Sequence, residues 1–386
     1  MSFDLSEDQR AFQRIAKDFS LKEFAPNAGE WDAKGEFPVE IIKKAGDLGF
    51  CSLYVSEEDG GMGLGRLDSS IIIEQLSAGC TSTTAFITIH NMALWMVSKY
   101  GSIELKNEWC PALCSGQKLA SYCLTEPGSG SDSASLKTTA VKKGDNYILN
   151  GSKSFISGAG ETDCLVLMAR TGKEGPAGIS CFLLPADTKG IEYGKKEEKM
   201  GWKNQPTRVI SLSDVEIPAS CLIGEEGQGF MIAMQGLDGG RINIATCSIG
   251  TAQAALEAAQ KYMNEREQFG KKLRDFQALQ FKLADMTTEL VAARHFIRLA
   301  ASKIDSEHSE ATVYAAMAKR FATDVGFNVC NEALQIFGGY GYLQEFPLER
   351  YVRDVRVHQI LEGTNEIMRM IIGRRMLMED ATQIIQ

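Results

Sequence analysis

The stretch FQALQFKLADMTTEL, residues 276–290, indicates what kind of fold this chain adopts. Its apolar side chains recur at steps of three and four, at Phe276, Leu279, Leu283, Met286 and Leu290. That spacing places them along one face of an α-helix, which is typical of a helix packed in a bundle. We therefore expect these side chains to form the core of a helical bundle.

Outward from this stretch, the chain divides into three segments of different character. Residues 1–120 and 230–386 are typical of helices, whereas 121–229 is rich in short apolar runs separated by Gly, Pro and Asp. No long helices alternate with these runs, which argues against a Rossmann sheet and favours a small antiparallel sheet or barrel. The prediction is a mostly α protein with an N-terminal helical domain (1–120), a middle antiparallel β-barrel or β-sheet domain (121–229) and a C-terminal helical bundle domain (230–386).

Strands can be placed within the middle segment. The runs 164–169 and 179–184 are apolar and bounded by turn-forming residues. Residues 147–149 and 152–156 flank Asn150-Gly151, a pair typical of a two-residue hairpin turn. We therefore expect a β-hairpin whose turn is Asn150-Gly151.

Composition excludes several functional classes. The formal charge of −9 argues against nucleic-acid binding, which needs a basic face. No run of about 18 uncharged apolar residues is present, so no transmembrane segment is expected. The ten cysteines and four histidines are scattered, which favours buried thiols in a reducing compartment and argues against a metal site. The N-terminus resembles neither a signal nor a transit peptide, and a processed mature chain would look the same.

Two glycine-rich segments could approach a ligand through their backbones. The loop YCLTEPGSGSD, residues 122–132, exposes amides and small hydroxyls that suit a phosphate or a polar ring. The turn QIFGGYGY, residues 335–342, follows a helical run, and its paired glycines permit close approach. Taken alone, the first is as readily an ordinary loop and the second a helix C-cap.

The segment ILEGTNE, residues 360–366, contains a candidate general base. Glu362 follows two apolar residues and precedes a glycine, so its carboxylate is expected to be poorly solvated. Poor solvation raises the pKa of a carboxylate and makes it a stronger base. The alternative is an ordinary helix start in which Thr364, Asn365 and Glu366 form the cap and first turn. Glu362 then precedes the cap and is free to point into a cleft.

Together these three motifs resemble those of the acyl-CoA dehydrogenases, in the family's order and at its distances over nearly the whole chain. The resemblance implies a C-terminal four-helix bundle, FAD between it and the β domain, and a homotetramer. It also implies an acyl-CoA substrate, electron-transfer flavoprotein as electron acceptor, and a mitochondrial matrix location.

The resemblance also implies roles for individual residues. Those that match the family's FAD contacts from one subunit are Tyr122, Leu124, Thr125, Gly130, Ser131, Phe155, Ile156 and Ser157, where threonine is commoner than serine at the last position. Those that match contacts from a neighbouring subunit are Arg266, Phe276, Gln277, Gln335, Ile336, Phe337, Gly338 and Gly339. Thr364, Asn365 and Glu366 match the adenosine side. The substrate contacts would be Ser131, Asp238, Gly239, Gly240, Arg241 and Arg374.

The resemblance implies that Glu362 is the catalytic base. Some family members place their glutamate just before the residue that matches Arg241, but this chain has Gly240 there. In the family the glutamate's own backbone N–H helps to stabilise the developing enolate. Glu362 would therefore remove the α-proton of the thioester while the β-carbon gives hydride to the flavin.

The substrate suggested by overall resemblance is isobutyryl-CoA of valine catabolism, which would yield methacrylyl-CoA. The alternatives are 2-methylbutyryl-CoA or butyryl-CoA. An acyl-CoA oxidase is disfavoured because oxidases are usually longer, and a non-enzymatic helical protein is disfavoured by the intact Glu362 and flavin loops. By family position, Thr88-Ile89-His90-Asn91 is expected to line the acyl pocket.

Overall fold

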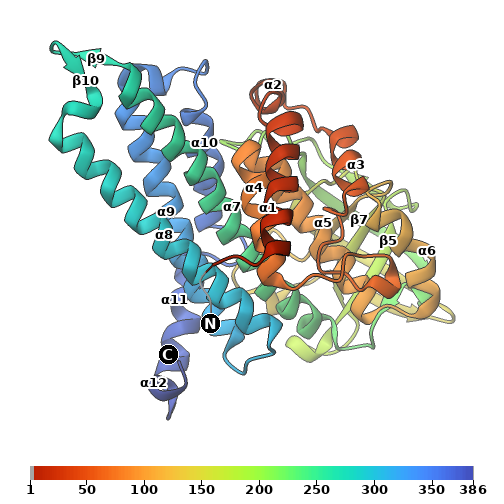
Figure 1. Cartoon of the computed structure of the whole chain (residues 1–386). Helices are drawn as coiled ribbons and strands as arrows, with labels where there is room; N and C mark the ends of the chain where they lie inside the picture. Colours follow the sequence, from red (N-terminus) through yellow and green to blue (C-terminus); the bar gives the residue numbers. More distant parts are fainter. Residues whose placement is uncertain (1–3, 386) are drawn as a thin grey trace.

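Helices form both ends of the chain, and a β-sheet lies between them in sequence (Figure 1). The structure is a computed structural model that describes residues 4–385. The predicted fold class, mostly helical with a central β part, is confirmed.

The N-terminal part consists of helices joined by short turns. They are α1 (Glu7–Phe19), α2 (Ala28–Lys34), α3 (Val39–Asp47), α4 (Arg66–Gly79), α5 (Thr81–Tyr100) and α6 (Ile103–Cys114). Helix α1 begins with a capping box, in which Ser6 Oγ accepts from Gln9 N at 3.1 Å and Gln9 Oε1 accepts from Ser6 N at 3.0 Å. Helix α4 is capped by the distant Asp305, which accepts from Arg66 N at 2.6 Å and Leu67 N at 3.0 Å. This cap ties the N-terminal part to the C-terminal bundle.

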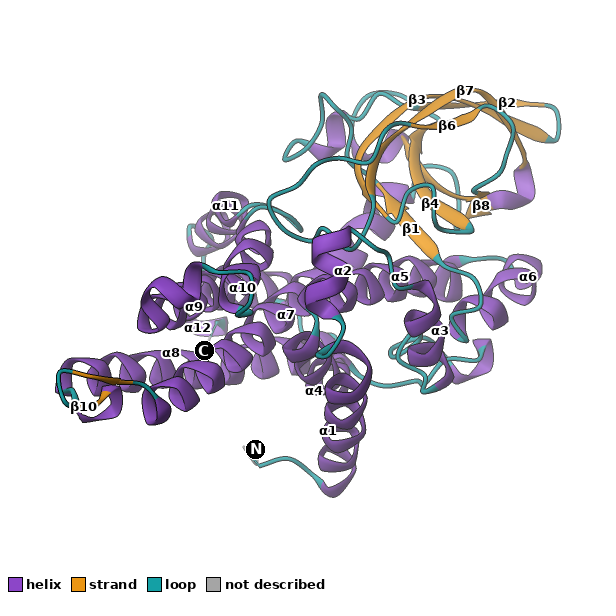
Figure 2. Cartoon of the chain, turned by 90° about the horizontal axis from the view of Figure 1, so that it is seen from above, coloured by secondary structure: helices purple, strands orange, loops and turns teal. Residues whose placement is uncertain are grey.

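The middle part is one strongly curved sheet of eight strands (Figure 2). Its strands are β1 (Ala120–Cys123), β2 (Thr139–Lys143), β3 (Asn146–Ser157), β4 (Cys164–Arg170), β5 (Ile179–Pro185), β6 (Ile191–Tyr193), β7 (Thr207–Pro218) and β8 (Leu222–Ile223). The order is β6-β7-β3-β2-β4-β5-β8, with β1 beside β4. Pairing is mainly antiparallel, but β1 and β2 both pair with β4 in parallel. Strand β1 packs against α5 and leads directly into the loop 122–132.

The predicted hairpin at Asn150-Gly151 is wrong. Strand β3 runs straight through these residues, and its pairing with β7 shifts register between Leu149 and Gly151. A Cβ on Gly151 would lie 2.5 Å from Thr138 Oγ1. The glycine therefore lets the backbone approach Thr138 closely at a β-bulge, and it does not form a turn. The hairpin turn lies earlier, at Gly144, whose φ is +63°.

The C-terminal part is built around one long helix. Its helices are α7 (Gly229–Glu265), α8 (Gln277–Asp305), α9 (Ala311–Phe337), α10 (Leu348–Arg356), α11 (Asn365–Met376) and α12 (Ala381–Ile384), with the short strands β9 (Glu267–Gln268) and β10 (Lys271–Lys272) between α7 and α8. Helix α7 packs against α8 and α9 on one side and against α4 and α5 on the other. In the predicted stripe Met286 and Leu290 are buried, and Leu279 and Leu283 pack against the same core.

Burial agrees with the expectation that the thiols lie in the core. Nine of the ten cysteine thiols are buried and Cys221 is partly exposed. Within residues 4–385, none of the helices combines the length and apolar character needed to cross a membrane.

Candidate active site

Glu362 lies in a sharp turn just before α11. Thr364 caps that helix, with its Oγ1 accepting from Ile367 N at 3.2 Å. The two residues before the cap have left-handed backbones, with φ of +56° at Glu362 and +86° at Gly363. Glycine adopts this conformation freely, whereas glutamate does so at an energetic cost. The surrounding contacts therefore hold Glu362 in place.

The side chain of Glu362 points at α7, where a glycine makes room for it. A Cβ on Gly240 would overlap Glu362 Oε2 and would lie 3.0 Å from its Cδ. The same Cβ would lie 3.2 Å from the sulfur of Met92 on α5. Gly240 is itself buried, so the carboxylate reaches the junction of α5, α7 and the turn before α11 because position 240 has no side chain.

The environment makes this carboxylate a base near neutral pH. Its Oε2 is enclosed and has no hydrogen-bond partner within residues 4–385. Burial raises the pKa of Glu362 to about 7, although the positive charges of Arg241 and Lys319 oppose the rise. The Tyr122 hydroxyl is also enclosed and unpartnered in this part of the chain, and burial together with Glu362 raises its pKa well above the usual value.

Two of the predicted substrate residues, Asp238 and Arg241, form an ion pair on α7. Arg241 is buried and pairs with Asp238 at 2.5 Å, and Asp238 also accepts from Thr312 Oγ1 at 2.6 Å. Gly239 lies against a residue that the sequence did not single out, because its Cβ would meet the guanidinium of Arg66 at 2.5 Å. Arg66 is buried over the ring of Tyr54, 3.4 Å from its centroid.

A buried ion pair shapes the glycine-serine loop after β1. The Glu126 carboxylate accepts from Lys137 N at 2.6 Å, Thr138 N at 3.0 Å and Lys153 Nζ at 2.8 Å. Lys153 also donates to Leu124 O at 3.0 Å. These bonds anchor one end of the loop and leave the other end open, where Gly130 and Ser131 are exposed.

Strand β3 ends beside this loop. Ser154 N donates to Thr125 O at 2.8 Å, and Ser121 Oγ, next to Tyr122, donates to Ser157 O at 2.7 Å. Phe155 has φ of +58° and is 73% exposed, whereas Ile156 is buried. The structure therefore brings the predicted cofactor residues of β1, its loop and the end of β3 side by side.

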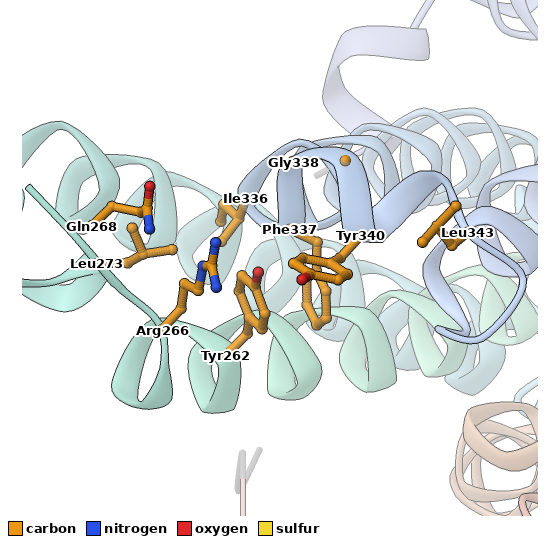
Figure 3. A pocket seen from close by; sticks show the side chains of 10 residues that line it. Tyr262, Arg266, Gln268, Leu273, Ile336, Phe337, Gly338, Tyr340 and Leu343 are labelled. Carbon is orange, nitrogen blue, oxygen red and sulfur yellow. The ribbon is translucent and has the colours of Figure 1, made fainter.

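A second group of predicted cofactor residues meets around a separate cavity at the far end of the bundle (Figure 3). The cavity has a volume of about 380 Å³ and is lined by Tyr262, Arg266, Gln268, Leu273, Ile336, Phe337, Gly338, Gly339, Tyr340 and Leu343. Arg266, Ile336, Phe337, Gly338 and Gly339 were predicted. Gln335 lies just before Ile336, and Phe276 and Gln277 lie at the start of α8, but none of these three lines the cavity.

The start of α11 is only partly available to a ligand. The Asn365 side chain faces inward, bonded to Lys319, Thr323 and Asp324. Glu366 is exposed in the first turn, and its backbone N–H and Thr364 lower its pKa. Arg374 is exposed in the last turn of α11.

His90 and Asn91, two of the four residues expected to line an acyl pocket, are bonded to backbone segments in the core. His90 Nε2 lies 2.9 Å from Leu113 O, and its Nδ1 accepts from Ala120 N at 3.0 Å. Asn91 accepts from Leu53 N at 2.7 Å. Both side chains hold backbone segments together. Ile89 of the same segment packs against the cluster that Leu361 also contacts, and Met92 of α5 lies against Gly240.

Sequence reasoning missed Lys319 of α9, which contacts the Glu362 turn. Its Nζ donates to Gly363 O at 2.7 Å. One signal could have revealed it, because Lys319 falls on the buried face of α9 among alanines, where an ordinary lysine would not be placed.

Models of known protein families match nearly the whole chain. The acyl-CoA dehydrogenase N-terminal domain matches residues 6–117, the middle domain 121–215 and the C-terminal domain 227–377. The chain belongs to the acyl-CoA dehydrogenase family. Acyl-CoA dehydrogenases are FAD-dependent oxidoreductases, so this protein is an enzyme of that class.

Individual relatives and solved structures are similar over nearly the whole chain. Mitochondrial isobutyryl-CoA dehydrogenase of Bos taurus is 54% identical over 378 residues, covering 98% of this chain and 91% of that protein. A chain of a structure of the electron transferring flavoprotein of Acidaminococcus fermentans is 42% identical, with a TM-score of 0.95, over 98% of this chain and 100% of that one. The structure of PigA with FAD and proline is 31% identical, with a TM-score of 0.94, over 97% of this chain and 99% of that one.

Proposed function

We propose that this enzyme oxidises isobutyryl-CoA to methacrylyl-CoA, with Glu362 as the base that removes the α-proton. The observation that carries the proposal is the Glu362 carboxylate, whose enclosed and unpartnered Oε2 lies in the space left by Gly240. Its pKa of about 7 suits proton abstraction at neutral pH. The choice of isobutyryl-CoA is supported by the 54% identity to a protein named for that substrate.

The residues present fit FAD. Side chains added at Gly130, Gly338 or Gly339 would meet nothing within 4 Å, so the backbone there is open to a ligand. Arg266 lies at the cavity of Figure 3, where it could bond a pyrophosphate. We assign the flavin ring to Tyr122, Leu124, Thr125, Phe155, Ile156 and Ser157, and the phosphate side to Gly130 and Ser131. When bound, FAD would accept the hydride that leaves the substrate's β-carbon.

The chain's own residues would carry the proton and hold the thioester. Glu362 takes the α-proton onto its carboxylate, and its backbone N–H donates to the thioester oxygen as negative charge develops there. Arg241, Asp238 and the backbone of Gly239 and Gly240 hold the substrate along α7, with Ser131 and Arg374 farther along the CoA. Exclusion of water by the packed α5 and α7 keeps Glu362 basic.

Assembly would complete the cofactor site. We propose that Arg266, Phe276, Gln277 and residues 335–339 serve the FAD of a neighbouring copy in a homotetramer, with Thr364, Asn365 and Glu366 at the adenosine side. The inward side chain of Asn365 leaves its backbone to make that contact. Electron-transfer flavoprotein is the proposed acceptor, and the mitochondrial matrix the proposed location, supported by the names of the relatives.

A substrate panel tests the proposal. The holoenzyme is assayed for kcat/KM with isobutyryl-, 2-methylbutyryl-, butyryl- and octanoyl-CoA, with electron-transfer flavoprotein as acceptor and oxygen as the control acceptor. Isobutyryl-CoA should give the highest value, and 2-methylbutyryl-CoA should react measurably, because one methylene in an apolar pocket discriminates by only about 10- to 200-fold. A higher value for butyryl-CoA or octanoyl-CoA would refute the substrate, and efficient turnover with oxygen would indicate an oxidase.

A further inference from the structure

Lys319 reaches from the middle of α9 to the turn that presents Glu362. Its side chain is fully buried. Its Nζ donates to Gly363 O at 2.7 Å and to Asn365 Oδ1 at 2.9 Å. Both acceptors lie within three residues of Glu362, one in the strained turn and the other at the first position of α11.

Burying a lysine at position 319 of α9 carries a cost in free energy. The neighbouring buried positions on the same face of α9, Ala315, Ala316, Ala322 and Thr323, are small and uncharged. Burying an ammonium among them carries a desolvation penalty that two neutral acceptors only partly offset. Next to Lys319 is the turn of Glu362 and Gly363, two successive residues with positive φ. A role in holding this strained turn accounts for the cost of burying the lysine.

We propose that Lys319 is a positioning residue for the reaction, which fixes the Glu362–Gly363 turn. This inference rests on the proposed function. The bond to Gly363 O fixes the orientation of the peptide that follows Gly363. Because that peptide closes the turn, the Glu362 backbone N–H and carboxylate both keep the direction that proton abstraction requires.

The charges around this turn give Lys319 a role that Arg241 does not share. Arg241 acts on Glu362 as well, but it is engaged by Asp238 at 2.5 Å. Lys319 instead donates to a carbonyl and an amide oxygen. Besides Glu362, the charged groups that act on Lys319 are Arg241, Asp324 and Glu366. Burial lowers the pKa of Lys319 to about 7, and the negative charge of Glu362 opposes this fall, so the two groups support each other's ionised forms.

The test compares two Lys319 variants with a variant of the uncharged neighbouring residue Thr323. Lys319→Met removes both the charge and the hydrogen bonds, whereas Lys319→Gln removes the charge and keeps a donor. Thr323→Val is the matched control, because it removes a hydroxyl that bonds the same Asn365, at 3.0 Å, without changing charge. FAD content and Tm are measured for each holoenzyme. The rate of anaerobic flavin reduction by isobutyryl-CoA, per bound FAD, is then followed against pH.

Both Lys319 variants should reduce flavin about 10- to 100-fold more slowly per bound FAD at saturating isobutyryl-CoA, because the Glu362 carboxylate is no longer held in place. The acid limb of the rate should move to higher pH by about one unit in both, because an opposite charge has been removed from Glu362, and it should stay in place in Thr323→Val. If Lys319→Met loses FAD, Lys319→Gln decides the outcome.

Wild-type rates and an unmoved acid limb in both variants would overturn the inference, as would an equal shift in Thr323→Val. Failure of the proposed function is distinct. In that case no acyl-CoA of the panel would reduce the flavin of the wild-type enzyme, and the inference would fall together with the proposed function.

Discussion

The carboxylate of Glu362 occupies the space that a side chain on Gly240 would need. A Cβ at position 240 would overlap Oε2 and come 3.0 Å from Cδ. These residues lie 122 positions apart, on α7 and before α11, so packing of the bundle brings them together. A side chain at position 240 and a carboxylate at position 362 therefore compete for one place.

Gly240→Ala should lower kcat by about 100-fold while FAD stays bound. The added methyl group displaces the Glu362 carboxylate from the position that proton abstraction requires, and a displacement of about 1 Å can have an effect of this size. The measurement is turnover per bound FAD. Gly373→Ala is the control, since it is also a helical glycine but a Cβ there meets nothing within 4 Å. Equal activity in both variants would show that position 240 does not control Glu362.

The acid limb of kcat/KM should report the Glu362 carboxyl. Burial raises its pKa to about 7. A base acts only when ionised, so kcat/KM should fall as pH drops through about 7 and level off above it. The profile is measured from pH 5.5 to 9 with enzyme of constant FAD content. A flat profile across pH 6 to 8 would contradict an enclosed carboxylate as the base.

The buried pair Lys153–Glu126 should be needed for stability and for FAD retention. Lys153 is fully buried and joins Glu126 to Leu124 O. Lys153→Met leaves the Glu126 carboxylate without its cation, which typically costs about 3–5 kcal/mol of unfolding free energy. Urea unfolding and flavin absorbance measure the two effects. Lys34→Met, which breaks the exposed pair with Glu30, is the control and should leave both unchanged.

Arg266→Ala should lower FAD content and Tm together if the cofactor is shared between copies. A ligand bound only by the folded assembly stabilises it by mass action, so loss of a contact lowers the apparent stability. Light scattering combined with flavin absorbance measures both assembly and occupancy. A monomer that retains stoichiometric FAD would refute the shared site.

The sequence was informative where a pattern is local and silent where it depends on packing. The strand runs 164–169 and 179–184 and the stripe of Leu279, Leu283, Met286 and Leu290 follow from spacing alone, and the structure confirms them, whereas Phe276 lies outside the core cluster. Asn150-Gly151 misled because glycine permits both a turn and a bulge, and only the register with β7 distinguishes them. His90 is polar but bonded within the core.

The candidate site also contains residues that local sequence patterns indicate and residues that only packing reveals. Glu362 could be named from its own neighbours in sequence. The reason that it can point inward, the empty position at Gly240, requires the packing of α7 against the turn. Lys319 lies 43 residues before Glu362, so its bond to Gly363 O could not be read from spacing. The unusual feature visible in the sequence is a lysine on the apolar face of α9.

Glu362→Gln provides the most direct test of the base. The amide has nearly the shape of the carboxylate, so it still fits beside Gly240, and the backbone N–H of residue 362 remains available to the thioester oxygen. What disappears is the group that accepts the α-proton. Removal of a general base typically costs about 10²- to 10⁴-fold in rate.

The experiment mixes the Glu362→Gln holoenzyme with isobutyryl-CoA in the absence of oxygen and follows the oxidised flavin band. Binding should perturb the band without bleaching it, because the substrate enters an intact site and cannot lose its proton. Tm and FAD content should match the wild type, which separates a lost base from a lost fold. Bleaching at close to the wild-type rate would mean that another residue takes the proton, and Glu362 would then have to be assigned a different role.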